Sequence, residues 1–222
     1  MAYREPPKPG QRRIALVHAI PVSIEPINKA FATHWPEAWV FNLLEDSLIA
    51  GLTEAGGFTP LFNRRVTDLC RYCVDTGADA ILFTGSAFGP AVDAAKAKTT
   101  IPVFKPYEAM IEAALAAGSR LGIVASFRGT FEPFKADVMA AAKKPIELFT
   151  EEATGALEAL EAGDSATHDR LTAEAAARLP ACDAIMLAQY SLARAAPLVK
   201  HPKVLTPPDA AVLHLKRLFD GR

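Results

Sequence analysis

The sequence predicts an α/β protein with two pseudo-symmetric lobes, each a mainly parallel four-stranded sheet flanked by helices. Two observations support this prediction. Apolar segments of strand length alternate with helical segments along the chain, which is typical of parallel sheets covered on both faces. In addition, three segments of the first half recur in the same order in the second half. The chain therefore reads as one unit of roughly a hundred residues written twice.

Three pairs of segments carry this repetition. Residues 79–90 (DAILFTGSAFGP) resemble 183–192 (DAIMLAQYSL), 13–19 (RIALVHA) resemble 120–126 (RLGIVAS), and 103–109 (VFKPYEA) resemble 204–210 (VLTPPDA). The offsets are 104, 107 and 101 residues, a drift that differences in loop length would produce. The first pair places Gly85 opposite Gln189.

The first lobe is expected over residues 12–100. Apolar runs predict its strands and helical spacing predicts its helices. Residues 79–90 form a buried strand, a tight turn that contains glycine, and the start of a helix. In order, the expected elements are strand 14–19, helix 23–34, strand 39–44, a short helix or loop at 48–57, helix 60–76, a strand from 80 and a helix over 91–98.

The second lobe is expected over residues 119–204. Residues 101–118 form a strand and a helix stopped by Gly118, and this helix is a candidate crossover between the lobes. Asp164 and Ser165 supply helix-cap chemistry. The expected elements are strand 121–125, helix 131–142, strand 146–149, helices 155–162 and 168–179, a strand at 185, a helix from 191 and a strand at 204. A last helix, within 205–222, is a candidate to cross back to the first lobe.

Composition and charge exclude several classes of protein. The net charge is −1, and no long run of Lys or Arg occurs, which argues against a nucleic-acid partner. No stretch approaches the ~20 apolar residues of a membrane span. Residues 1–13 have no apolar signal-peptide core, so a cytoplasmic protein is expected.

Cysteine and glycine patterns predict neither a metal nor a cofactor. Cys70 and Cys73 have redox-motif spacing, but they lie within a helical pattern and are expected to be helix thiols that pack. Cys182 precedes a strand and is also expected to pack. The five histidines are scattered, so no zinc site is expected. Neither a dinucleotide-binding glycine fingerprint nor a phosphate-binding loop occurs.

Ligands of parallel sheets bind beyond the carboxyl ends of the strands, so the residues that follow the strands are the candidates for function. Hydroxyl side chains recur at these strand ends, beside the N–H groups of helix starts, and together they would suit an anion such as a carboxylate. The alternative is that they are ordinary helix caps. The hydroxyl residues are Thr84, Ser86, Ser126, Thr130 and Ser191.

Four side chains at strand ends are candidates for acid–base chemistry. His18 titrates near neutral pH, although a structural histidine is an equal alternative. The phenol of Tyr190 could donate a proton, or the ring could simply pack. Glu108 and Asp209 are equivalent in the repeat, and each also suits the first turn of a helix.

Two cations also follow predicted strands. Lys105 and Arg128 either attract a carboxylate substrate or are solvated, and the sequence leaves both alternatives open.

Two turns and one strand end carry a family resemblance. The segments TGSA at 84–87, AQYS at 188–191 and ASFRGT at 125–130 are similar to those of the aspartate/glutamate/hydantoin racemase superfamily. This superfamily also contains maleate isomerases and arylmalonate decarboxylases. The resemblance implies a cleft between the lobes that holds a small carboxylate or related carbonyl substrate, without a cofactor. It also implies a homo-oligomer.

The racemases of this superfamily place a cysteine at each of the two turns, one on each face of the substrate. Here Gly85 and Gln189 occupy both positions. Neither side chain can exchange a proton at neutral pH, whereas a thiol with a pKa of about 8.5 can. A two-cysteine mechanism is therefore not expected. The decarboxylases also have glycine at the first turn, but they keep the second cysteine.

Two functions follow from this pattern. The first is a cofactor-independent racemase, isomerase or decarboxylase that works through an enolate-like intermediate, with acid and base recruited from His18, Tyr190, Glu108 or Asp209. The alternative is a non-catalytic protein that binds a small carboxylate. For both, the expected substrate contacts are Thr84, Gly85, Ser86, Ala87, Ser126, Thr130, Gln189 and Ser191.

Overall fold

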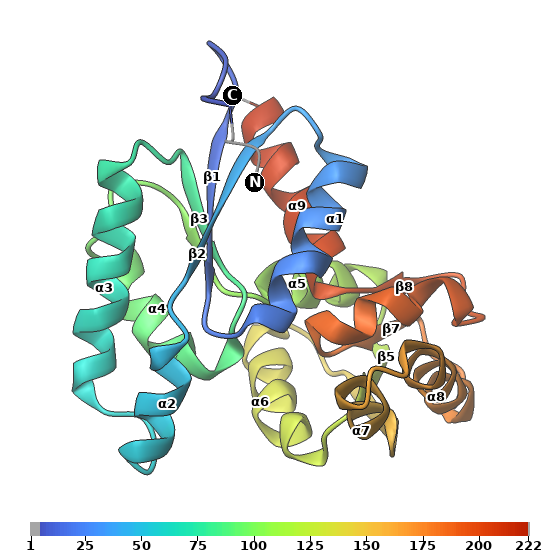
Figure 1. Ribbon diagram of the computed structural model, residues 1–222. Helices are drawn as coiled ribbons and strands as arrows, with labels where there is room; N and C mark the ends of the chain where they lie inside the picture. The colour runs from blue at the N-terminus through green and yellow to red at the C-terminus, as the bar shows by residue number, and fades with distance from the viewer. Residues whose placement is uncertain (1–4, 222) are drawn as a thin grey trace. The chain divides into compact units, whose positions relative to one another are not determined.

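The computed structural model describes residues 5–221, apart from the side chain of Ser86 (Figure 1). The chain divides into two compact units, which meet in sequence between Pro106 and Tyr107. The first unit contains the whole of the expected first lobe. The second contains the expected second lobe together with the helix that precedes it and the helix that follows it.

The first unit alternates strands and helices. Its elements are β1 (Arg13–His18), the 3-10 helix η1 (Pro21–Ser23), α1 (Ile24–His34), β2 (Trp39–Leu44), α2 (Ser47–Glu54), α3 (Pro60–Asp75), β3 (Ala80–Phe83), the 3-10 helix η2 (Ser86–Phe88), α4 (Gly89–Lys96) and β4 (Val103–Phe104). The strands form one parallel sheet in the order β2-β1-β3-β4. Helix α2 lies where the sequence left a choice between helix and loop.

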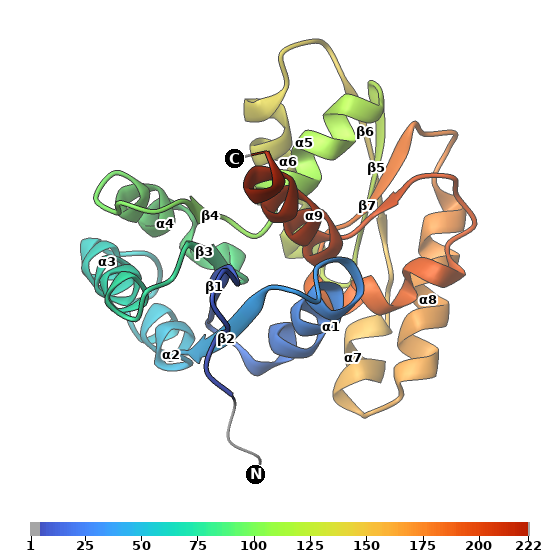
Figure 2. The same ribbon diagram turned by 90° about the horizontal axis from the view of Figure 1, so that it is seen from above.

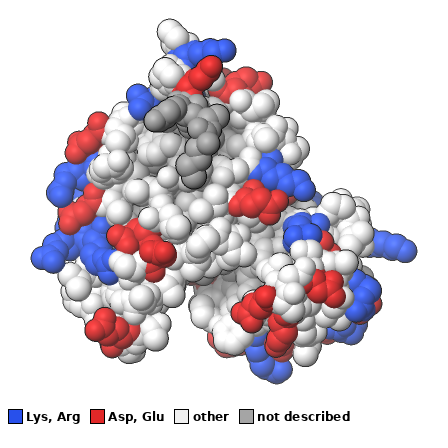
Figure 3. Space-filling view, viewed as in Figure 1, with Lys and Arg blue, Asp and Glu red and all other residues white. Residues whose placement is uncertain are grey.

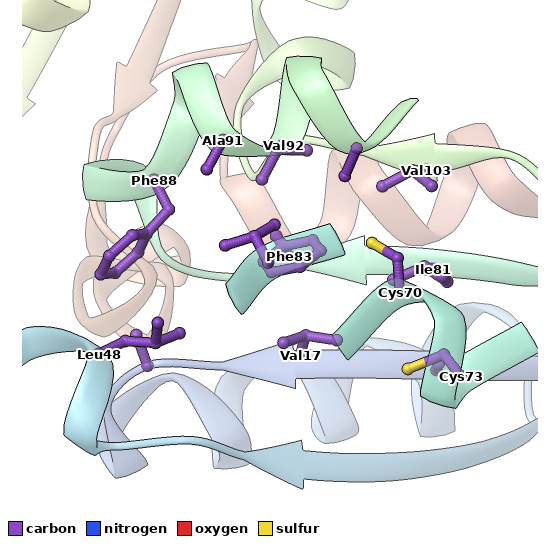
Figure 4. Close-up of a cluster of buried hydrophobic side chains, with 14 of the residues drawn as sticks. Val17, Leu48, Cys70, Cys73, Ile81, Phe83, Phe88, Ala91, Val92 and Val103 are labelled. Carbon is purple, nitrogen blue, oxygen red and sulfur yellow. The ribbon is translucent and has the colours of Figure 1, made fainter. Parts of the chain in front are cut away.

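The core of the first unit lies between this sheet and the helices α3 and α4. Val17 of β1 and Phe83 of β3 point into it, because alternate residues of a strand face the same side. Figure 4 shows these side chains with Cys70 and Cys73 of α3, whose thiols lie among buried apolar groups. Both cysteines are fully buried, and burial raises their pKa values to about 11 and about 12, respectively. They pack as helix thiols and stay protonated at neutral pH.

The second unit follows the same scheme. Its elements are α5 (Glu108–Ala117), β5 (Arg120–Ala125), the 3-10 helix η3 (Arg128–Thr130), α6 (Phe131–Ala141), β6 (Glu147–Glu152), α7 (Ala156–Glu161), α8 (Ser165–Arg178), β7 (Ala184–Leu187), the 3-10 helix η4 (Tyr190–Leu198), β8 (Val204–Leu205) and α9 (Pro207–Asp220). Its strands are parallel in the order β6-β5-β7-β8. The predicted fold class, two parallel four-stranded sheets flanked by helices, is confirmed.

Helices cover both faces of the second sheet, as Figure 2 shows from above. Leu121 and Ile123 of β5 face α5 and α6, whereas Val124 faces α7 and α8. Helix α9 packs against α5 within this unit. The segment expected to be a helix from Ser191 is the 3-10 helix η4, which contains Pro197; proline lacks the N–H that an α-helix would need there.

An aspartate fixes the start of the central strand in each unit. Asp79 accepts a hydrogen bond from the Arg13 N–H at 2.7 Å, and Asp183 accepts one from the Arg120 N–H at 2.8 Å. In the return direction, the N–H of each aspartate donates to the carbonyl of the same arginine at 2.7 Å. Each aspartate–arginine pair fixes the register between two neighbouring strands. The register in turn sets which residues lie side by side at the carboxyl ends of these strands.

The surface carries charges of both signs. Figure 3 shows Lys and Arg side chains intermixed with Asp and Glu on the face that it presents. Within residues 5–221, no helix is both long and apolar enough to cross a membrane.

We expect Gly118→Ala to destabilise the second unit. A Cβ at this position would overlap the carboxylate of Asp183, which accepts the N–H groups of Ser119 and Arg120 at 2.8 Å. Overpacking of this kind costs about 1–3 kcal/mol. Gly85→Ala is the matched control: its Cβ would lie 3.5 Å from the nearest atom, and we expect a change within about 0.5 kcal/mol. Urea unfolding measures both, and equal losses would contradict the structure.

Candidate active site

The parallel strands of each unit bring their carboxyl ends to one edge of the sheet. In the first unit, β1 ends at His18, and Thr84 directly follows β3. The Thr84 N–H still donates to the Val17 carbonyl at 3.0 Å, so Thr84 lies beside the end of β1. Pairing of β1 with β2 places Asn42 opposite Leu16 in the same sheet.

A polar cluster forms at this edge, made of the buried residues His18, Ser23 and Thr84 and the exposed residue Asn42; we refer to it as the His18 cluster. The His18 Nδ1 lies 2.8 Å from the Thr84 hydroxyl and 3.1 Å from the Ser23 hydroxyl. The two hydroxyls are 2.8 Å apart, and the His18 Nε2 lies 2.9 Å from Asn42 Oδ1. The ring of His18 is completely buried.

This environment favours the neutral form of His18. Removal from water lowers the pKa of the imidazole, and the hydrogen bond to Asn42 opposes the shift to a lesser extent. The other three members of the His18 cluster are uncharged. His18 is therefore a neutral group able to accept a proton at pH 7.

The turn after β3 leaves space for a side chain at Gly85. Its backbone is not in the left-handed region, and a Cβ would meet Ala19 at 3.5 Å and Phe88 at 3.9 Å, which are ordinary contacts. Glycine is therefore not required here by backbone conformation or by crowding. Ala87 is exposed in η2, and the side chain of Ser86 lies outside the described part of the chain.

A second polar cluster forms at the corresponding edge of the second unit; it consists of Ser126, Thr130 and Gln189. Ser126 follows β5 and donates both its N–H, at 2.7 Å, and its hydroxyl, at 3.0 Å, to Gln189 Oε1. The Gln189 amide nitrogen donates to the Thr130 hydroxyl at 3.5 Å. The amide oxygen is thus fixed, and the –NH₂ group is the part of Gln189 that can donate to a ligand.

The next two residues differ in exposure. Tyr190 is buried, and its hydroxyl has no hydrogen-bond partner within the described residues. Burial, with a smaller contribution from Tyr107, raises the pKa of this phenol well above its usual value of 10. Tyr190 therefore stays protonated. Ser191 follows in η4 and is half-buried.

The two predicted acidic candidates lie in the first turns of helices. The Thr206 hydroxyl donates to Asp209 Oδ2 at 2.5 Å, and the Asp209 N–H donates back to Thr206 at 3.3 Å, which caps α9. Glu108 is the first residue of α5 and is half-buried. Both placements agree with the helix-cap alternative.

The two predicted cations each have an acidic partner. Lys105 lies 3.1 Å from Asp93. Arg128 lies 3.7 Å from Glu152, and its side chain is 87% exposed. Within the described residues, no three His, Cys, Asp or Glu side chains are placed to hold a metal ion.

Sequence reasoning missed Ser23 and Asn42. The offset of 107 residues places Ser23 opposite Thr130, and each closes a 3-10 helix after the first strand of its unit. Asn42 is the single polar residue of β2, WVFNLL. These two signals were present in the sequence, but contact with His18 could be seen only in three dimensions.

Comparison with known proteins gives a family and a set of similar folds. A protein-family model described as Asp/Glu/Hydantoin racemase matches residues 25–215. No curated relative matches the chain. Solved structures of the same fold do exist, at low sequence identity.

Three of these structures illustrate the sequence identity and structural similarity of the matches. Allantoin racemase from Klebsiella pneumoniae is 17% identical, with a TM-score of 0.71, over 95% of this chain and 88% of that one. An aspartate racemase homologue from Pyrococcus horikoshii OT3 is 14% identical, with a TM-score of 0.70, over 95% and 100%. Glutamate racemase from Thermus thermophilus, in complex with beta-chloro-D-alanine, is 13% identical, with a TM-score of 0.68, over 95% and 81%.

The buried histidine predicts a pH dependence of stability. Because the folded-state pKa of His18 lies below the unfolded value of about 6.5, the unfolded chain binds more protons as the pH falls through that value. The wild type should therefore lose stability between pH 7 and pH 5, and His18→Gln should lose less. Urea unfolding at both pH values measures the difference between the two proteins, in which all other histidines are shared. Identical losses would contradict a buried neutral His18.

Proposed function

The chain belongs to the Asp/Glu/hydantoin racemase family, and from that premise we propose that it is a cofactor-independent enzyme. Its reaction would move a proton at the carbon beside the carboxylate or carbonyl group of a small substrate. Racemisation, isomerisation and decarboxylation all pass through such an enolate-like intermediate.

One observation carries this proposal. His18, a buried and neutral base, lies 2.8 Å from the hydroxyl of Thr84, at the strand edge where ligands of parallel sheets bind. A buried titratable group with a shifted pKa, in hydrogen-bond contact with a hydroxyl at such an edge, is typical of catalytic sites. This arrangement supplies proton chemistry where the resemblance implies a cysteine and Gly85 offers none.

The remaining polar groups suit the recognition of a carboxylate or carbonyl oxygen. Gln189 presents its –NH₂ group because Ser126 fixes its amide oxygen. Ser191 and Thr130 would add further donors in the second unit, and the backbone N–H groups of the turn at Gly85 and Ala87 are donors of the same kind in the first unit. Binding through neutral donors suits a substrate with a single carboxylate, since Lys105 and Arg128 each already face an acidic side chain.

A second candidate function is binding without catalysis. It is favoured by the double hydrogen bond from Ser126 to Gln189, which uses the amide for structure at the position where the resemblance implies the family's second cysteine. A protein of this kind would be stabilised by its ligand and would leave the ligand unchanged.

We expect the enzyme to exchange the α-hydrogen of its substrate with solvent. Incubation in D₂O with aspartate, glutamate, hydantoins, maleate and malonates, followed by proton NMR, should show loss of the α-proton signal or a new product. His18→Gln should slow the exchange by at least about 100-fold, whereas His214→Gln on α9, where His214 lies 3.4 Å from Glu112, should not.

Two outcomes would contradict the enzyme proposal. Thermal stabilisation by one of these compounds without exchange would favour the binding protein. Neither stabilisation nor exchange with any of them would exclude this class of substrate for both candidate functions.

Placing a cysteine at both Gly85 and Gln189 tests whether these two turns correspond to the cysteine-bearing turns of the family's racemases. Gly85 has space for a side chain, so Gly85→Cys with Gln189→Cys should fold. If the two positions are those of the family's thiols, the double variant should gain racemisation of a substrate or ligand identified above, measured by polarimetry. Each single variant is the matched control and should not gain it. A folded double variant with no gain would contradict this correspondence.

A further inference from the structure

This inference rests on the proposed function and names the group that meets the substrate in the first unit. His18 cannot do so directly. Its ring is completely buried, its Nδ1 faces the hydroxyls of Thr84 and Ser23, and its Nε2 faces the amide of Asn42. A proton that reaches the ring through hydrogen-bonded groups passes through one of these neighbours, and of the two hydroxyl residues Thr84 is 5% exposed and Ser23 1% exposed.

In the orientation that the structure gives it, the amide of Asn42 favours a hydrogen on one ring nitrogen of His18. Asn42 and Asn28 form a reciprocal pair, in which each Nδ2 donates to the other's Oδ1 at 3.3 Å. In this orientation, Asn42 Oδ1 faces the His18 Nε2, and an oxygen acceptor requires a hydrogen on that nitrogen. The lone pair of the neutral ring is therefore on Nδ1, directed at Thr84 and Ser23.

A count of hydrogens indicates that the His18 cluster can accommodate one added proton. In the chain of contacts Nδ1–Thr84–Ser23–Ile20 carbonyl, the three distances are 2.8, 2.8 and 2.9 Å. The two hydroxyls supply only two hydrogens, so a neutral ring with its hydrogen on Nε2 leaves one contact without a donor. A proton added at Nδ1 supplies the third hydrogen. Nδ1 can then donate to Thr84, Thr84 to Ser23, and Ser23 to the Ile20 carbonyl oxygen.

We propose that Thr84 is the catalytic residue of the first unit, and that His18 and Asn42 are positioning residues that act through it. The Thr84 oxygen takes the proton from the substrate carbon while its own hydrogen passes to His18 Nδ1. The electron pair of the broken C–H bond stays on the substrate as an enolate, and the ring becomes an imidazolium. Return of the proton by the same path completes the exchange.

Nearby charges do not change this assignment. Asn42, Ser23 and Thr84, the side chains hydrogen-bonded to the ring, are uncharged. Glu45, whose N–H binds the carbonyl of His18, directs its carboxylate to Ser47 at 2.6 Å and Arg65 at 3.6 Å. Glu25, in the first turn of α1, is exposed to water.

We expect nitrogen-15 NMR of the histidine rings, on the ligand-free protein, to find His18 neutral at pH 7 with its hydrogen on Nε2. Asn42→Asp places a carboxylate against Nε2 and should raise the titration midpoint of His18 by about one unit or more. Asn28→Asp, one step further from the ring, is the control and should raise it less. A hydrogen on Nδ1 in the neutral wild type would overturn the proposal whether or not a substrate is known.

Variants of Thr84 provide the second measurement, α-hydrogen exchange with the substrate found above. Thr84→Ser keeps the hydroxyl and should retain exchange within about tenfold, whereas Thr84→Val has the same shape and should lose at least about 100-fold. The loss should appear in kcat rather than in KM, because the step removed is proton transfer. Exchange by Thr84→Val at the wild-type rate would overturn the proposal while leaving the proposed function intact.

Discussion

Parallel pairing of the central strands is the constraint on which the rest of the structure depends. Because β1 and β3 run in the same direction, their carboxyl ends meet at one edge, and the same holds for β5 and β7. An aspartate at the opposite end of each pair fixes the register. A one-residue slip would turn every side chain to the other face of the sheet, which would separate His18 from Thr84.

Uncharged groups make up both polar clusters. In the first unit, a buried histidine meets hydroxyls and an amide; in the second, a serine and a threonine hold a glutamine. A buried charge without a partner would cost several kcal/mol, whereas neutral groups that exchange hydrogen bonds avoid this cost. Both clusters offer directed donors and acceptors, and the imidazole of His18 is the group that can take up a proton.

The sequence was informative about the fold because strand-length apolar runs and helical spacing are local signals. The repeated segments predicted matching units, and the identical strand order of the two sheets agrees with that hypothesis. Contacts between side chains far apart in sequence could not be predicted: Asn42 and Ser23 meet His18 only because β2, β1 and η1 converge there. The candidate site residues stay predictions, although helix capping already accounts for the contact of Asp209 with Thr206.

The mechanism proposed for the first unit requires His18 to be a neutral base with its lone pair directed at Thr84. Neutron diffraction from crystals grown in D₂O at pH 7 would test it most directly, since deuterium positions are visible. We expect deuterium on Nε2 of His18, none on Nδ1, and the hydroxyl deuterium of Thr84 pointing at Nδ1. Deuterium on Nδ1, with the Thr84 hydroxyl turned away from the ring, would contradict it.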